Sequence, residues 1–164
     1  MWGLMIICYA CMAISCILLF LTGIQGYFQF IILKASHQQF ALFSTIFYMF
    51  SETLIMFYFI GSGTAIKKEV AQSDIPAITY DKVKKTKMIL FPHLTLNMLL
   101  VGIVFISGGA VETGSISGFV HGILYITTFF HFIYTIRIQH IGFKKNIDVV
   151  IELADFNEAR SVIS

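Results

Sequence analysis

Residues 1–33, MWGLMIICYACMAISCILLFLTGIQGYFQFIIL, contain no charged side chain. A hydrocarbon core about 30 Å thick needs roughly 20 apolar residues in a helix, so this stretch is long enough to cross a membrane. The apolar region of a cleaved signal peptide is only about 7–15 residues long and follows basic residues, which are missing here. We therefore predict a retained membrane helix over residues 4–24.

Three further apolar stretches follow along the chain. Together with the first, they predict helices at about residues 4–24, 40–62, 88–107 and 118–136. A lipid-exposed segment must satisfy its own backbone hydrogen bonds, so each stretch should be α-helical. Of the 164 residues 57% are hydrophobic and 12% are charged, whereas soluble domains carry about 25% charged residues. We predict an all-α integral membrane protein whose residues 1–137 form an antiparallel bundle of four transmembrane helices.

The basic residues are concentrated in two segments. Most lie between the second and third predicted helices or after the fourth, and the other two connections contain only Lys34. Basic loops remain on the cytoplasmic side of a membrane. We therefore predict a bacterial inner-membrane protein with cytoplasmic N- and C-termini. The lysines form no basic face and no nucleic-acid-binding motif, so we expect no nucleic acid as a partner.

Residues 138–164 mix apolar and acidic side chains. Ile147, Val150, Ile151 and Ala154 recur at a helical spacing among acidic residues, a pattern typical of an amphipathic helix. We predict a short cytoplasmic helix here, which either continues the fourth membrane helix or lies on the membrane. It is also a candidate docking element for a partner subunit.

A polar stripe runs along the second predicted helix and includes Tyr48 and Glu52. Glu52 lies near the middle of the membrane, where a charged side chain costs several kcal/mol unless it is protonated or paired. On the third helix, Asn97 should reach a similar depth, so we expect it to contact Glu52. The stripe indicates a group that carries protons or binds an ion. The alternative is a neutral glutamic acid that hydrogen-bonds to a neighbouring helix and stabilises the bundle.

The histidines fall at two depths. Counted inward from the helix ends, His93 and His131 both lie in the cytoplasmic third, and His37 and His121 both lie near the external surface. Two histidines at one depth on different helices are what a six-coordinate haem b requires. His121 and His131 are only about 15 Å apart along the helix, which is short for two stacked haems, so the outer pair is the weaker site. Alternatively, all four are hydrogen-bonded core or interfacial residues.

Two short motifs favour packing over chemistry. Gly114, Gly118 and Gly122 recur every fourth residue, a pattern typical of close helix contact in membranes. Cys8 and Cys11 have the spacing of a redox or zinc motif, but they lie inside an apolar helix. We expect these cysteines to pack as small apolar side chains.

Three functions are compatible with these residues. We expect a small membrane subunit of a larger complex, of the respiratory or electron-transferring class, which binds a haem b. The second hypothesis is a proton or ion transporter that uses Glu52 and assembles as a homo-oligomer. The third is a structural or assembly subunit without a cofactor. The sequence contains no nucleotide-binding loop, catalytic triad or metalloprotease motif, so we do not expect a free-standing enzyme.

Overall fold

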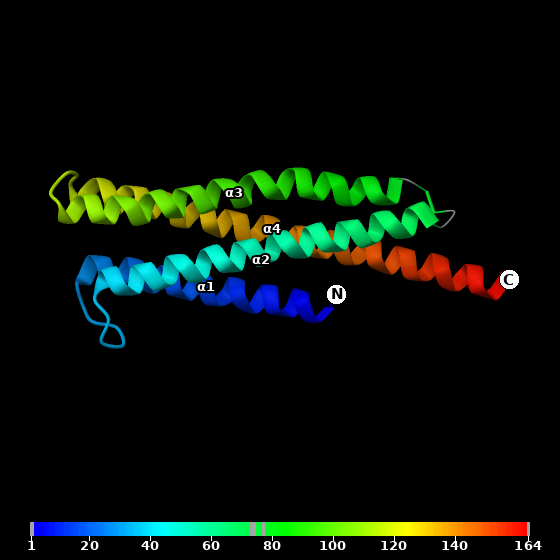
Figure 1. Ribbon diagram of the computed structural model, residues 1–164, viewed down its shortest axis with the longest axis horizontal. Coiled ribbons are helices and arrows are strands. Elements are labelled where there is room, and N and C mark those ends of the chain that lie inside the picture. Colours follow the sequence, from blue (N-terminus) through cyan, green and yellow to red (C-terminus); the bar gives the residue numbers. More distant parts are fainter. Residues whose placement is uncertain (1, 73–74, 77, 164) are drawn as a thin grey trace.

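The protein consists of four long helices. The computed structural model describes residues 2–72, 75–76 and 78–163, with side chains up to residue 160. The helices are α1 (Trp2–Phe28), α2 (His37–Gln72), α3 (Ile78–Glu112) and α4 (Gly118–Ile163). They lie lengthwise beside one another (Figure 1). Each is long and apolar enough to cross a membrane, so the prediction of an all-helical chain with four such helices is confirmed.

Three of the helices are much longer than the predicted spans. Helix α4 alone has 46 residues, or about 69 Å at 1.5 Å per residue, against a hydrocarbon core of about 30 Å. Most of the segment between residues 62 and 88, which we expected to be a basic loop, is helical, and residues 138–163 continue α4 without a break. Lys and Glu are good helix formers. Hydropathy detects only the apolar part of such a helix.

The inward-facing residues of the helices are spaced alternately three and four apart. In α1 the buried positions up to residue 22 are Met5, Cys8, Met12, Ser15, Leu19 and Thr22, and Gln25 follows three residues later. In α4 they include Thr128, Phe132, Thr135, Gln139, Gly142, Asn146, Val149 and Leu153. This seven-residue repeat is the packing pattern of left-handed coiled coils. Polar residues share the repeat with apolar ones, so the interior of the bundle carries hydrogen-bonding groups.

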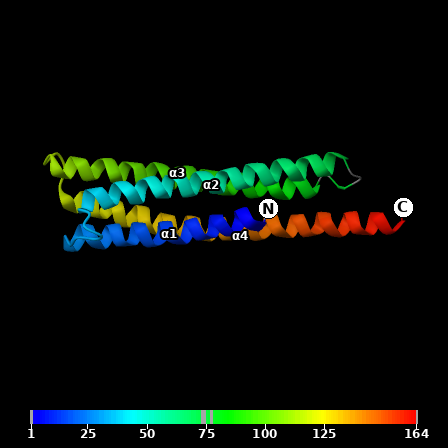
Figure 2. The ribbon, with the colours of Figure 1, turned by 60° about the horizontal axis from the view of Figure 1, so that its bottom comes forward.

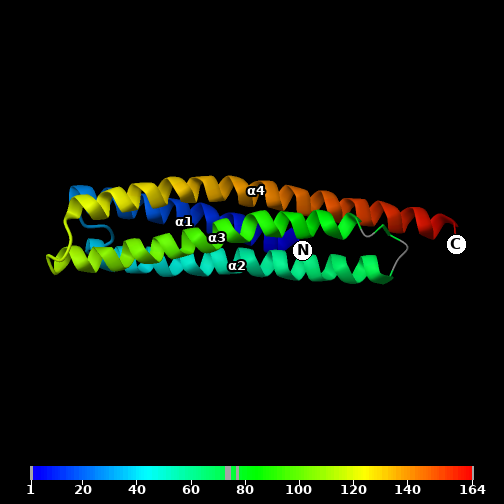
Figure 3. The same ribbon diagram turned by 90° about the horizontal axis from the view of Figure 1, so that it is seen from above.

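The two ends of the molecule differ in the number of helices. The connections 29–36 and 113–117 lie at one end, which we call the loop end (Figures 1 and 3). Helix α1 begins near the middle of the molecule, where Trp2 lies beside Tyr58 and Ile147. From there α2, α3 and α4 continue without α1 (Figure 2). We call this three-helix part, residues 63–72, 78–87 and 144–160, the stalk.

The stalk has its own apolar core. Ile66, Val83, Val149 and Leu153 are buried together with Ile75. Residues 138–163 are part of one long helix. The apolar face predicted for this segment is not the buried one: Ile151 is 48% exposed and Ala154 is exposed, whereas Val149 and Leu153 face the core. Lysines such as Lys67, Lys68, Lys84 and Lys85 lie exposed on the outer faces of the helices.

Candidate functional site

A chain of two hydrogen bonds joins three helices in the middle of the bundle. Asn97 of α3 donates from Nδ2 to the Tyr48 hydroxyl of α2 at 2.7 Å. On its other side, Asn97 Oδ1 lies 2.6 Å from His131 Nδ1 of α4. Tyr48 and Asn97 are both fully buried. Because an amide oxygen only accepts, His131 Nδ1 carries the hydrogen and its Nε2 is left as a free base.

Glu52 lies one turn beyond Tyr48 on α2 and has a different partner from the one we expected. Gln139 of α4 donates from Nε2 to Glu52 Oε2 at 2.5 Å. The expected contact between Glu52 and Asn97 is therefore wrong: the hydrogen bonds of Asn97 go to Tyr48 and His131. Sequence analysis missed Gln139 because it lies beyond the predicted span of the fourth helix. It lies two turns from His131 on the same buried face.

Several polar atoms around Glu52 have no partner. Glu52 Oε1, Gln139 Oε1 and Ser51 Oγ are all buried without a hydrogen bond among the described residues. Both carboxyl and amide oxygens accept hydrogen bonds, so Glu52 and Gln139 lack a donor between them. A proton on Glu52 Oε1 supplies one. Buried polar groups are nearly always paired, so this arrangement favours the neutral form of the carboxyl group.

The inner histidine pair is brought together by α3 and α4. The ring centroids of His93 and His131 are 5.7 Å apart, as expected for residues at one depth on neighbouring helices. Tyr134 packs edge-on against His93 at 5.2 Å. His93 Nδ1 is buried and has no hydrogen-bond partner in the described part of the chain. The cluster thus places two imidazoles at the end of the Tyr48–Asn97–His131 chain.

This cluster leaves no room for a porphyrin in the observed arrangement. The Tyr134 centroid lies 5.2 Å from His93 and 6.4 Å from His131. It therefore lies about 5 Å from the midpoint between the imidazoles, where a haem iron would sit, and nearly in the plane of the macrocycle. The hydrogen bond from His131 Nδ1 to an amide oxygen does suit an axial ligand. The hydrogen bond at His131 Nδ1 therefore suits a haem ligand, whereas the position of Tyr134 does not suit a haem.

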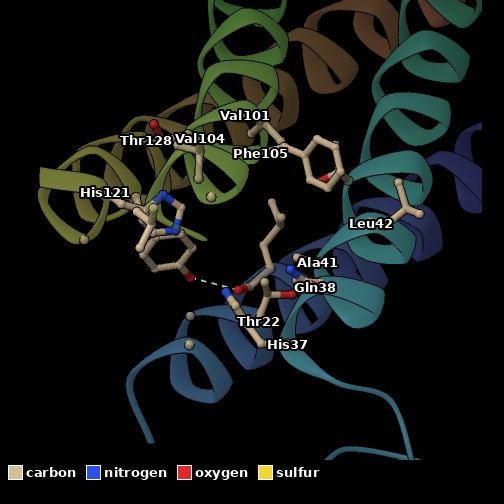
Figure 4. Close-up of a pocket in the computed structure, with 18 of the residues that line it drawn as sticks. Thr22, His37, Gln38, Ala41, Leu42, Val101, Val104, Phe105, His121 and Thr128 are labelled. Atoms are coloured by element: carbon tan, nitrogen blue, oxygen red, sulfur yellow. Dashed lines mark hydrogen bonds between the residues drawn. The ribbon is translucent and has the colours of Figure 1, made fainter. Parts of the chain in front are cut away.

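The outer histidines line one large cavity at the loop end. Its volume is about 1060 Å³, and all four helices contribute to its wall. Figure 4 shows His121 on one side of this cavity and His37 beside Thr22. His121 Nδ1 lies 2.8 Å from the hydroxyl oxygen of Ser107. The pair thus shares a cavity.

The cysteine and glycine residues that we expected to mediate helix packing lie in different environments. Cys8 is fully buried within an apolar cluster. Gly114 lies in the turn before α4 with a positive φ of 71°. A Cβ at Gly122 would meet nothing within 4 Å, so this glycine faces open space. The prediction that Gly122 mediates close helix contact is wrong, because the helices separate at this end to form the cavity.

One buried polar group lies outside every predicted span. Asn146 donates from Nδ2 to the Tyr58 hydroxyl at 3.1 Å, and its Oδ1 accepts from Ser62 at 3.3 Å. It links α4 to α2 where the stalk begins. The seven-residue repeat of α4 is the sequence signal that locates it.

Comparisons with known proteins add no assignment. No family model matches the sequence, and comparison with curated proteins and with solved structures finds no significant match. Among the described residues, no group of three or more His, Cys, Asp or Glu side chains could hold a metal ion.

Proposed function

We propose that the chain is an integral membrane protein that crosses the bilayer four times as an antiparallel bundle. Large apolar side chains cover its outer surface, for example Ile17 at 59%, Phe50 at 58% and Phe130 at 69% exposure. Lipid is the environment in which such a surface is stable. The lysines of the stalk support its placement on the cytoplasmic side of a bacterial inner membrane, with both termini.

Within this membrane protein, we propose that the polar interior transfers protons. The observation that carries the proposal is the hydrogen-bond chain Tyr48–Asn97–His131, which crosses three helices one turn from Glu52. Ionisable groups inside a membrane are costly. They usually face the interior of the helix bundle and often mark proton or ion pathways. Here Tyr48 and Glu52 are fully buried, His131 is half-buried, and Glu52 Oε1 has no partner among the described residues.

Each residue has a chemical role in this proposal. Glu52 holds the proton in the middle of the membrane, and Gln139 orients its carboxyl group through the bond to Oε2. Asn97 does not carry a proton, but it fixes the Tyr48 hydroxyl and the tautomer of His131. His131 Nε2 is a second base in the interior, and water would carry the proton between it and Glu52 because Asn97 does not.

The biological setting in this proposal is a larger membrane complex of the electron-transferring class, in which this chain is the small subunit. Such complexes couple electron transfer to proton movement, which requires a proton-carrying interior of this kind. The stalk supplies a surface outside the membrane for contact with a partner subunit. A homo-oligomer would use the exposed apolar faces of the spanning segments instead.

The test measures proton flux into liposomes that contain the purified protein and a pH-sensitive dye, driven by a potassium diffusion potential. Glu52→Gln keeps the shape and the hydrogen-bonding capacity of the side chain but cannot release a proton. We expect it to assemble normally and to reduce flux at least tenfold. Tyr48→Phe removes one hydroxyl group and should reduce flux by a smaller factor. Tyr27→Phe is the matched control, since Tyr27 is 84% exposed.

Three outcomes would overturn the proposal: normal flux through Glu52→Gln, equal effects of Tyr48→Phe and Tyr27→Phe, or no flux through the unaltered protein. If Glu52→Gln is silent while Glu52→Leu unfolds the bundle, Glu52 is a structural hydrogen-bonding group. The chain is then an assembly subunit without a transport role.

A second proposal is favoured by one observation, the pairing of His93 and His131 at 5.7 Å. These two imidazoles would hold a haem b once the Tyr134 ring leaves the space between α3 and α4. Haem would supply one-electron chemistry, and Asn97 would fix the His131 ligand.

Reduced-minus-oxidised spectra of the purified protein should then show b-type bands. His93→Ala or His131→Ala should abolish the bands, and Tyr134→Ala should preserve or increase them. A folded, colourless protein that stays colourless when haem is added to the Tyr134→Ala variant would contradict this proposal.

A further inference from the structure

The cavity at the loop end has walls that are short of side-chain atoms. Six glycines line it: Gly23, Gly26, Gly108, Gly109, Gly118 and Gly122. At Gly109 and Gly122 an added Cβ would meet nothing within 4 Å. The α1–α2 pair and the α3–α4 pair diverge toward this end (Figure 1). A volume of about 1060 Å³ is at the upper end of the range for small-molecule sites.

Most of the wall is apolar, but one buried hydroxyl group in it has no partner. Thr128 is only 4% exposed, lines the cavity, and its Oγ1 makes no hydrogen bond among the described residues. An unpaired buried hydroxyl group carries an unfavourable cost. A lipid acyl chain in the cavity would leave that cost in place, whereas a ligand oxygen would remove it.

A second polar atom in the wall is a defined acceptor. The Ser107 hydroxyl donates to the carbonyl oxygen of Val104 at 2.7 Å, which uses its only hydrogen. His121 Nδ1, 2.8 Å from the same oxygen, must therefore carry the hydrogen of that bond. The Nε2 atom of neutral His121 is then a bare acceptor. The cavity thus presents the Thr128 hydroxyl group and the His121 imidazole base, alongside other polar side chains of its wall such as His37 and Glu112.

The spacing of these two groups restricts the ligand. His121 and Thr128 are seven residues apart on α4, which is about 10.5 Å along the axis and about 20° around it. An aromatic ring with two oxygens in para positions spans about 5.5 Å, and a hydrogen bond of about 2.8 Å at each end extends this to about 11 Å. Figure 4 shows His121 and Thr128 on one side of the cavity, with Ala41 and Leu42 of α2 on the other.

We infer that this cavity binds a membrane-soluble hydroquinone. One ring oxygen donates to His121 Nε2, the other accepts from the Thr128 hydroxyl, and the apolar tail lies along Val101, Val104 and Phe105. The site is separate from Glu52 and from the His93–His131 pair, so it stands whether or not the chain transfers protons.

The binding experiment uses the full chain in lipid nanodiscs and two probes: a 1,4-hydroquinone with a decyl tail, kept reduced, and decylbenzene, which lacks the oxygens. Thr128→Val keeps the shape of the side chain and removes the hydroxyl group. It should weaken hydroquinone binding about three- to tenfold and leave decylbenzene binding unchanged. His121→Leu should have an equal or larger effect on the hydroquinone alone.

Two matched controls are available in the chain. Thr127→Val changes the adjacent exposed threonine, which already donates to the carbonyl of Ile123 at 2.9 Å, and should have no effect. Gly122→Leu fills the cavity and should abolish binding of both probes. Gly61→Leu, at a glycine that also has nothing within 4 Å but lies outside the cavity wall, should not.

Each alternative occupant gives a distinct result that overturns the inference. Equal affinity for the two probes, with no effect of Thr128→Val, identifies a site for lipid acyl chains. Failure of both probes to bind the unaltered protein identifies a water-filled cavity. Binding that survives Gly122→Leu identifies non-specific partition into the bilayer.

Discussion

In the stalk, α2, α3 and α4 meet through Ile66, Val83 and Val149, whereas at the loop end the same three helices and α1 surround a cavity of about 1060 Å³. The inward-facing positions follow a similar three- and four-residue spacing in both regions. The difference is in what occupies and surrounds those positions. Branched side chains fill the space between the helices in one region. In the other, Gly109 and Gly122 face open space, although a Cβ at Gly23 or Gly26 would collide with Tyr125 or His37.

The comparison separates two uses of one packing pattern. Where large side chains interdigitate, the helices are held at fixed separations, and any change in side-chain volume alters stability. Where the walls lack side chains, volume can be added without displacing a neighbour. A ligand site therefore lies where the bundle is least packed. Stability comes from the packed stalk and from the adjoining cluster that includes Phe59 and Phe143, which are fully buried.

The largest expected effect is the loss of packing at Phe143. Its ring is fully buried and stacks on Phe59 at 4.9 Å and Tyr58 at 5.0 Å. Phe143→Ala should lower the free energy of unfolding by about 3–5 kcal/mol, the usual cost of removing a buried aromatic ring. Denaturation of the purified protein in mixed micelles, followed by circular dichroism, measures this quantity.

The matched change at the loop end is Phe105→Ala. Phe105 lines the cavity and is 38% exposed, so its removal should cost less than about 1 kcal/mol. Equal costs for the two phenylalanines would contradict the contrast between a packed and an open region.

A smaller effect, of opposite sign in the two regions, is expected for two glycines of α4. A Cβ at Gly142 would lie 3.1 Å from the ring of Phe59 and 3.5 Å from Thr86, and a fully buried ring has little room to move. Gly142→Ala should therefore destabilise the bundle by about 1 kcal/mol. A Cβ at Gly122 would meet no atom. Gly122→Ala should therefore stabilise the bundle by up to about 1 kcal/mol, because alanine has the higher helix propensity. The same unfolding measurement decides both signs, and two changes of one sign would be inconsistent with the observed spacing.

Hydropathy and helix geometry were sufficient to predict part of this molecule. Uncharged stretches such as residues 1–33 predicted the four helices. Counting 1.5 Å per residue correctly brought His93 and His131 together. Both inferences need only one helix at a time and its depth in the membrane.

The partners of the polar residues could not be predicted in the same way. Which side chain meets Glu52 depends on how α2 and α4 are rotated and paired, and Gln139 lay outside the predicted span. The glycine repeat at residues 114–122 was misread because the same small residues permit close contact or leave space. Only the positions of the neighbouring helices distinguish the two.

The smallest expected effect concerns the ion pair on the surface of the stalk. Lys82 Nζ lies 2.7 Å from Glu152 Oε2, and the two side chains are 51% and 45% exposed. Exposed pairs of this kind contribute about 0.2–1 kcal/mol, so a double-mutant cycle of Lys82→Gln and Glu152→Gln should give a coupling energy in that range. The coupling should fall when salt is raised from 0.1 to about 1 M, because the Debye length shrinks from about 10 Å to 3 Å. Lys84→Gln, at an exposed lysine on the same helix, is the control and should not couple to Glu152. A coupling energy of several kcal/mol that persists in high salt would contradict this prediction. The charges would then hold the stalk together, and the apolar core at Ile66, Val83 and Val149 would not be the feature that distinguishes the stalk from the loop end.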